Sequence, residues 1–243
     1  MKLIDAHCHL ANLAELMPLE PLLAAAQERG ITRFISAALR KSEVEWYLQN
    51  TDPRILFSAG IHPNFAACDL DIKRIRELCE NKSIWAIGEI GLDHGNPELA
   101  VQRMQFKAQL ELAGDYHLPV VLHIVGHQAE AYQTLKEYPS RYLVHGYSGS
   151  VEGFRQLSRL DAAFSISARI LKEDKQDLLS AMLKHQRILF ETDITQYYVQ
   201  EGETNPLLRL LEVLEQTSQI SGISADKLLQ LQNISAKWLF PLQ

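Results

Sequence analysis

Histidine and carboxylate side chains stand where several short apolar segments of this 243-residue chain end. The segment Asp5-Ala6-His7-Cys8-His9 closes the first apolar run, and Glu89 closes a later one. Imidazole nitrogens and carboxylate oxygens are common protein ligands of divalent transition metals. Six such residues form the candidate set of metal ligands: His7, His9, Glu89, His123, His145 and Asp193.

The spacing of these residues favours a shared site. His7 and His9 point to the same side of an extended strand, while Cys8 points to the other side. A buried charge on Glu89 is costly unless a cation, or a partner such as Arg103 or Lys107, neutralises it. Each residue taken singly has an ordinary structural explanation, but all six together predict a metal centre.

Four imidazoles and two carboxylates exceed what one tetrahedral ion needs. The set suits two divalent ions with a carboxylate between them. Imidazole-rich ligation favours Zn²⁺, Mn²⁺, Ni²⁺ or Fe²⁺, whereas Mg²⁺ prefers oxygen donors and retained water. Two such ions outweigh the negative charges of Glu89 and Asp193, so the site becomes net positive and can attract a phosphate.

The elements that must position these residues follow from the alternation of short apolar runs with amphipathic stretches. We expect strands at residues 3–7, 33–37, 55–59, 84–88, 119–123, 142–145, 162–165 and 188–191. We expect helices at residues 21–29, 70–79, 98–116, 151–160, 174–183, 206–216 and 225–239, and another that His127 opens. This α/β pattern predicts a (β/α)8 barrel, with a doubly wound open sheet as the alternative. In a barrel the candidate ligands meet at the C-terminal ends of the strands, where such folds place active sites.

Composition narrows the class of protein. The chain is 47% hydrophobic and 22% charged, as in globular proteins, and we expect one domain over residues 1–243. Its net charge of −6 argues against the broad positive face of a non-specific duplex binder. Cys8, Cys68 and Cys79 form no disulfide framework or CxxC pair, and the apolar segments are too short for a bilayer. We therefore expect a cytoplasmic protein without membrane contact; nothing in the sequence specifies its oligomeric state.

The motifs, in their order, resemble those of the TatD family of metal-dependent hydrolases, within the amidohydrolase-like superfamily, over essentially the whole chain. They are Asp5-Ala6-His7-Cys8-His9-Leu10, Gly60-Ile61-His62-Pro63, Ala86-Ile87-Gly88-Glu89-Ile90-Gly91-Leu92-Asp93, Leu118-Pro119-Val120-Val121-Leu122-His123, His145-Gly146-Tyr147-Ser148-Gly149 and Glu191-Thr192-Asp193, with Gln102, Phe106 and Gln109 in the helix after the third of them.

The resemblance implies a distorted barrel that binds one or two divalent metals. By analogy with the family, one ion is held by His7, His9, Glu89 and Asp193, and the second by Glu89, His123 and His145. Members of the family are described as deoxyribonucleases, often 3′–5′ exonucleases on single strands. A related branch is described as deacylating D-aminoacyl-tRNA.

This chain departs from the family pattern around the ligands. The family usually has Ser-Arg after the fifth-strand His, where this chain has Ile124-Val125-Gly126. His94-Gly95 replaces an aromatic pair, and Ile194-Thr195 replaces Ala-Pro. The missing Arg leads us to expect that Arg169, or else Lys172, contacts phosphate.

Other substrate contacts are expected from the loops at the same rim. His62 ends the third strand and faces the rim. Tyr147 and Ser148 follow the sixth strand, and Tyr147 and Tyr197–Tyr198 could stack bases as in single-strand binders.

The predicted chemistry is hydrolysis by water whose pKa the metals lower. Asp193 is the expected general base, and Glu89, shared by both ions in the family, is the second expected catalytic residue. We expect a phosphodiesterase, or deoxyribonuclease, that acts on DNA or RNA ends. One alternative is a hydrolase of an ester or amide bond, such as a D-aminoacyl-tRNA deacylase. Another is a metal-binding subunit of a complex without turnover.

Overall fold

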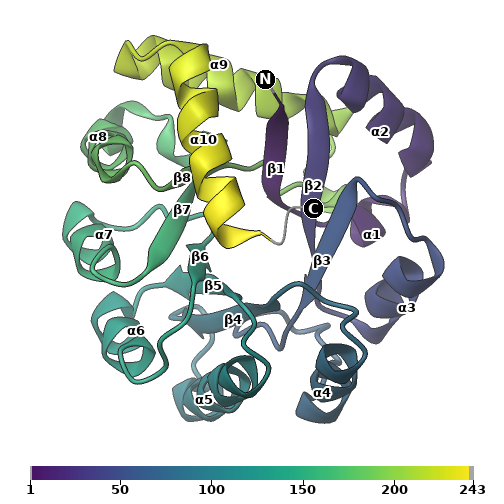
Figure 1. Ribbon diagram of the computed structural model, residues 1–243, viewed down its shortest axis with the longest axis vertical. Coiled ribbons are helices and arrows are strands. Elements are labelled where there is room, and N and C mark those ends of the chain that lie inside the picture. Colours follow the sequence, from purple (N-terminus) through teal and green to yellow (C-terminus); the bar gives the residue numbers. More distant parts are fainter. Residues whose placement is uncertain (1, 241–243) are drawn as a thin grey trace.

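Eight parallel strands close into a barrel in sequence order, with β8 returning to pair with β1 (Figure 1). This computed structural model describes residues 2–240. The strands are β1 Leu3–Cys8, β2 Ile31–Ala38, β3 Ile55–Ala59, β4 Ile87–Asp93, β5 Val120–Val125, β6 Tyr142–Val144, β7 Ala162–Ile166 and β8 Ile188–Phe190. The predicted (β/α)8 barrel is confirmed, and the open sheet is excluded because both edges are paired. The barrel is distorted, since single residue pairs join β3 to β4 and β8 to β1.

Helices surround the barrel, and most of them lie where the sequence predicts. They are α1 Leu10–Leu13, α2 Leu19–Glu28, α3 Lys41–Gln49, α4 Ile72–Glu80, α5 Leu99–Asp115, α6 Gln128–Leu135, α7 Val151–Leu157, α8 Gln176–His185, α9 Arg209–Ser221 and α10 Ala225–Leu239. The sequence did not predict α1, which is a single turn, or α3. The buried residues of α3 include the carboxylate Glu43 as well as Val44 and Tyr47, so its apolar periodicity is weak.

The fourth strand differs from its prediction. We expected residues 84–88, but β4 runs from Ile87 to Asp93, so Glu89 lies inside the strand. Glycines allow this segment to approach β5 closely. A Cβ on Gly88 would lie 2.5 Å from the Val121 side chain, and one on Gly91 would lie 1.9 Å from the carbonyl oxygen of His123. Both glycines have φ angles, 158° and 150°, that L-residues rarely adopt.

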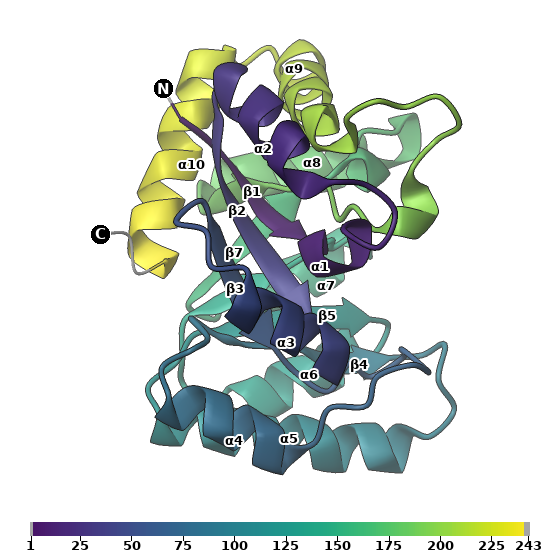
Figure 2. The same cartoon turned by 90° about the vertical axis from the view of Figure 1, so that its right-hand side faces the viewer.

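The N-terminal end of the barrel is closed by α10, which crosses the front of Figure 1. Leu239 and Phe240 belong there to an apolar cluster that includes Ile4 of β1 and Trp85, which lies just before β4. In Figure 2, α10 lies on the left and the loops that follow the strands lie on the right. The two ends of the barrel therefore have different covers: a helix at one end, loops at the other.

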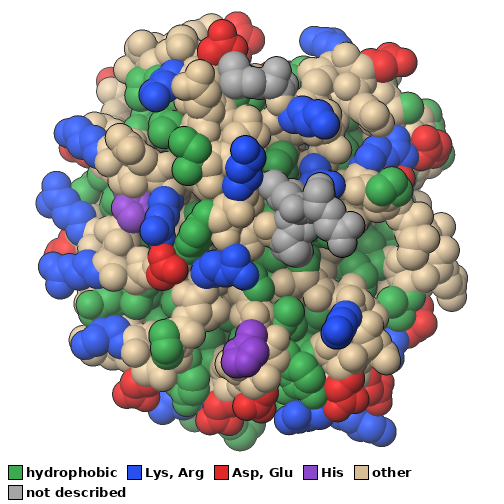
Figure 3. Space-filling view, in the orientation of Figure 1, with side chains coloured by type: hydrophobic (Ala, Val, Ile, Leu, Met, Phe, Trp, Pro, Cys, Tyr) green, Lys and Arg blue, Asp and Glu red, His purple; other side chains and the backbone are tan. Residues whose placement is uncertain are grey.

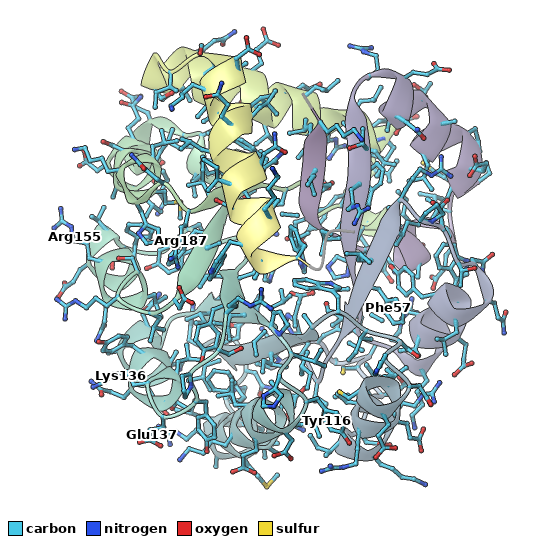
Figure 4. All side chains as sticks on the ribbon, viewed as in Figure 1. Phe57, Tyr116, Lys136, Glu137, Arg155 and Arg187 are labelled. Atoms are coloured by element: carbon cyan, nitrogen blue, oxygen red, sulfur yellow. The ribbon has the colours of Figure 1, made fainter. Side chains whose placement is uncertain are left out.

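The outer surface is mixed in character. Charged side chains of both signs lie around the α10 face (Figure 3). Lys136 and Arg155 point outward from the helix ring (Figure 4). None of the helices within residues 2–240 has both the length and the apolar composition needed to cross a membrane.

Candidate metal centre

Glu89, on β4, is the centre of the polar cluster at the C-terminal end of the barrel. Its side chain is buried, and its Oε1 atom lies 3.3 Å from Nε2 of His7 and 3.3 Å from Nε2 of His9. Asp193 faces the same two rings, with Oδ1 3.7 Å from Nε2 of His7 and 3.5 Å from Nε2 of His9. His7, His9 and Asp193 therefore converge on one side of Glu89.

The other carboxylate oxygen of Glu89 faces three more imidazoles. Its Oε2 atom lies 2.7 Å from Nε2 of His145, 3.7 Å from Nδ1 of His123 and 3.6 Å from Nε2 of His62. The structure thus brings together all six candidate ligands, with Glu89 between the two groups. His62, which we expected as a substrate contact, lies within the second group.

Backbone hydrogen bonds beyond the regular strands fix these residues. The N–H of Asp193 donates to the carbonyl of His7, and the N–H of His9 donates to the carbonyl of Ile194, both at 3.0 Å. The buried carboxylate of Asp5 accepts hydrogen bonds from the N–H and hydroxyl of Thr192. These contacts connect the end of β1 to the segment after β8. They therefore fix His7, His9 and Asp193 relative to one another.

The donor set fits a divalent metal ion. Within the described residues, Nε2 of His7 and Oε1 of Glu89 are buried without hydrogen-bond partners, although each faces the other. Burial raises the pKa of Glu89, but the imidazoles of His145 and His7 outweigh it and hold that pKa well below its usual range. An ionised carboxylate among buried, unpartnered imidazole nitrogens is the environment that a cation completes.

The imidazoles differ in their proton affinity. Burial, reinforced by the neighbouring His7, lowers the pKa of His145 to about 4. Burial likewise lowers the pKa of His62 to about 3. Burial opposes protonation of His9 and His123 too, but hydrogen bonds to Asp193 and Asp93 respectively help raise their pKa values to about 9. Metal binding must displace protons from the second pair but not from the first.

A cavity of about 290 Å³ opens onto the cluster. It is lined by His9, Asn12, Leu39, Glu43, His62, Asn64, Phe65, Glu89, His123, His145, Arg169, Asp193, Thr195, Tyr197 and Tyr198. Tyr197 and Tyr198 are 75% and 54% exposed. The short turn that carries them is anchored, because the Gln196 N–H donates to Asn12 and Arg209 donates to the carbonyl of Tyr198.

Only two of the four expected substrate contacts line the cavity. His62 and Arg169 line the cavity, whereas Tyr147 and Ser148 do not. The prediction that Tyr147 contacts the substrate is wrong. Tyr147 is 2% exposed, packs against Phe164, and donates a hydrogen bond from its hydroxyl to the carbonyl of Ser150. No base can stack on a ring that lies in the core.

Arg169 reaches the cluster itself. One of its terminal N–H groups donates to Oδ2 of Asp193 at 2.6 Å, while Oδ1 of Asp193 faces His7 and His9. A guanidinium has five N–H donors, so this contact leaves others for a ligand. Asp193 thus connects the metal cluster to the cation of the cavity wall.

Sequence reasoning assigned no role to Asp93, Glu191 and Gln109. Oδ2 of Asp93 lies 2.9 Å from Nε2 of His123, and the fully buried Glu191 faces Nδ1 of His145 at 4.0 Å. Gln109, on α5, binds both the N–H and the carbonyl of Ile61, next to His62. The alternation of strand residues could have identified Asp93, since it lies four positions after Glu89 and so on the same side.

Comparisons with known proteins match nearly the whole chain to one family. A family model described as TatD related DNase matches residues 4–241. An uncharacterized metal-dependent hydrolase of Methanocaldococcus jannaschii is 25% identical over 93% of this chain and 92% of its own length. The 3′–5′ ssDNA/RNA exonuclease TatD of Pantoea ananatis is 26% identical over 92% and 93%. The crystal structure of YjjV, a TatD homologue from Escherichia coli K12, superposes with a TM-score of 0.85 at 24% identity, covering 99% of this chain and 98% of that chain.

Proposed function

Because the chain belongs to the TatD-related DNase family and is a metal-dependent hydrolase of that family, we propose that it is a phosphodiesterase that cleaves DNA or RNA at chain ends. The observation that carries this proposal is the convergence of four imidazoles and the carboxylate of Asp193 on the buried Glu89. The named activity of the Pantoea ananatis relative supports a nucleic acid as the substrate.

Two divalent ions fit the two groups of side chains around Glu89. His7, His9 and Asp193 would hold one ion with Oε1 of Glu89, and His123 and His145 would hold the other with Oε2. The predominance of imidazole favours Zn²⁺, Mn²⁺ or Ni²⁺ over Mg²⁺. When bound, such ions lower the pKa of water and neutralise charge that develops on phosphoryl oxygens.

The protein's own residues orient the substrate and accept the proton. Asp193 is the proposed general base, since its neighbours hold its pKa below the usual range despite burial and so keep it ionised. Arg169, on the cavity wall, replaces the cation that is missing after His123 and would bind a phosphate oxygen. Tyr197 and Tyr198, exposed at the mouth, offer faces on which bases can stack.

We place the protein in the cytosol. All three cysteines are free thiols, and Cys8 and Cys79 are buried. Unpaired thiols suit a reducing compartment.

The proposal is tested by metal analysis of the purified protein together with hydrolysis of single-stranded DNA, RNA and a generic phosphodiester. Wild type, His123→Ala and Asp193→Asn are compared with Zn²⁺, Mn²⁺ or Mg²⁺ and with a chelator. We expect chelator-sensitive cleavage, its loss in His123→Ala, and a kcat lower by orders of magnitude in Asp193→Asn. Bound metal without cleavage of any phosphodiester would contradict the proposal.

A second candidate is hydrolysis of an ester or amide bond, such as that of an aminoacyl-tRNA. The observation that favours it is the uncharged segment Ile124-Val125-Gly126 after His123. Arg169 is the cavity's only arginine, and the cavity has no lysine, among the residues that the structure describes. An aminoacyl ester makes fewer demands on phosphate recognition than a nucleic-acid end does. Turnover of an aminoacyl-tRNA without phosphodiester cleavage would support this candidate.

A further inference from the structure

The two imidazoles on the Oε2 side of Glu89 use opposite ring nitrogens. His123 presents Nδ1 towards Glu89, whereas His145 presents Nε2. The outer nitrogen of each ring faces a second carboxylate. Asp93 lies 2.9 Å from Nε2 of His123, while Glu191 lies 4.0 Å from Nδ1 of His145. Only the first distance is that of a hydrogen bond.

Asp93 is itself held in place. Its Oδ1 atom accepts a hydrogen bond from the N–H of Gly95 at 2.7 Å, so Oδ2 is the oxygen that faces His123. Gln102 of α5, which is 1% exposed, binds the backbone of Asp93 on both sides. Its Oε1 accepts from the Asp93 N–H at 2.8 Å, and its Nε2 donates to the Asp93 carbonyl at 3.0 Å. The carboxylate that meets His123 therefore has little freedom to turn away.

An ionised carboxylate can only accept hydrogen bonds. Both oxygens of Asp93 face donors, because Oδ1 accepts from the Gly95 N–H and Oδ2 lies 2.9 Å from Nε2 of His123. The proton of a neutral His123 ring must then lie on Nε2, so Nδ1, which lies 3.2 Å from Nε2 of His145, carries a lone pair and no proton. In metalloproteins such an outer carboxylate commonly fixes both the tautomer and the orientation of a ligand histidine.

We propose that Asp93 is the positioning residue that fixes His123 with its Nδ1 lone pair directed at the metal ion between His123, His145 and Glu89. The inference rests on the proposed function only in requiring a bound ion, because it concerns binding of the metal and not cleavage of a substrate. Glu191 forms no hydrogen bond with His145, because both carboxylate oxygens of Glu191 are buried without hydrogen-bond partners in the region described.

The sharpest test is Asp93→Asn, because its outcome depends on which amide atom faces the ring. The N–H of Gly95 requires an acceptor, so the amide oxygen takes the position of Oδ1 and the NH₂ group faces Nε2 of His123. Nε2 must then accept, the proton moves to Nδ1, and the lone pair aimed at the ion is lost. Asp93→Ala leaves both tautomers open and should be less harmful than Asp93→Asn.

The first measurement is Zn²⁺ titration of the metal-free, full-length protein by calorimetry. We expect wild type to bind two equivalents. In Asp93→Asn the second equivalent should weaken about 100-fold, in Asp93→Ala about 10-fold, and the first should change little. Glu191→Gln is the matched control in the same half of the site and should weaken the second equivalent less than Asp93→Asn does. Equal Zn²⁺ affinities in wild type and Asp93→Asn would overturn the inference.

A second measurement does not depend on metal affinity. Nitrogen-15 NMR of the metal-free protein, recorded along a rising pH series until the His123 ring is neutral, reports which ring nitrogen carries the proton. We expect Nε2–H in wild type and Nδ1–H in Asp93→Asn. A wild-type Nδ1–H tautomer would contradict the inference even if only one ion binds. If the wild-type protein cleaved no phosphodiester, that result would instead contradict the proposed function and leave this assignment of Asp93 intact.

Discussion

The two ends of the barrel bury their side chains equally well but complete their interactions differently. At the N-terminal end, Leu239 is 0% exposed and packs in an apolar cluster with Ile4 and Trp85. At the C-terminal end, His7 is 1% exposed and Glu89 2%, yet the facing atoms of both lack a hydrogen-bond partner in the described chain. Apolar packing completes the interactions at the N-terminal end, whereas the polar atoms at the C-terminal end are arranged to bind a ligand.

This difference separates stability from function. Apolar burial stabilises the fold without any further component. Burial of charged and polar groups destabilises the fold unless a partner of opposite charge binds them. In parallel barrels the catalytic residues come from the C-terminal ends of the strands, so loops there can vary while the opposite end preserves the fold. If the two ends are independent in this way, a substitution at one end leaves the property set by the other end unchanged.

The largest expected effect is at the candidate metal centre. Glu89→Gln removes the carboxylate charge that both groups of imidazoles face, and kcat/KM for a phosphodiester should fall on the order of 1000-fold, or about 4 kcal/mol. Steady-state rates measure the loss, and circular dichroism checks that the variant is folded. Activity within about tenfold of wild type would show that Glu89 is not central.

The opposite end should show the converse. Leu239→Ala leaves a cavity under α10 and should lower the free energy of unfolding by about 3 kcal/mol. Urea unfolding measures this change. The folded variant should keep the wild-type kcat, because the substitution touches no residue of the cluster. A lower kcat at temperatures where the variant is folded would mean that the two ends are coupled.

Removal of metal from the C-terminal end should lower the free energy of unfolding of the whole barrel. With free Zn²⁺ at about 100 times its Kd, a chelator should lower the free energy of unfolding by about 2.7 kcal/mol for each ion that it removes. The same decrease is expected in Leu239→Ala, because distant, independent sites contribute additively. Chelator titrations of urea unfolding curves would reveal any difference between wild type and variant.

The smallest expected effect is on the cavity wall. Arg169→Ala removes a cation that binds Oδ2 of Asp193 but places no atom among the ligand nitrogens. KM for a phosphodiester should rise about tenfold, or about 1.4 kcal/mol, while the bound metal content stays unchanged. Metal analysis and steady-state kinetics on the same samples measure both quantities. An unchanged KM would remove Arg169 from phosphate binding.

The sequence predicted much of the fold because its signals are local. Short apolar runs and amphipathic runs with the helical period depend on neighbours in the chain, and they located all eight strands and most helices. The same locality failed for α3, whose buried face includes Glu43. It also failed for the bounds of β4, which follow from close approach to β5 at Gly88 and Gly91.

The candidate site divides in the same way. Its six proposed ligands could be identified from the sequence, because each lies at or near the end of a predicted strand and parallel strands bring their ends together. Tyr147 could not be distinguished from Arg169 as a substrate contact. One side chain turns into the core and the other into the cavity, and that choice depends on packing across the loops.

By itself, then, the sequence determined the alternation of strands and helices and the chemical type of the residues at the strand ends. Only the tertiary structure decided which ring nitrogen of His123 faces Glu89, and that Asp93 and Gln102 stand behind it. The physical reason is that periodicity is set by residues a few positions apart in one chain. The orientation of the His123 ring is set by its hydrogen bond with the Asp93 side chain, and the Gln102 side chain of α5 binds the Asp93 backbone. Barrel closure and register fix the positions of these elements.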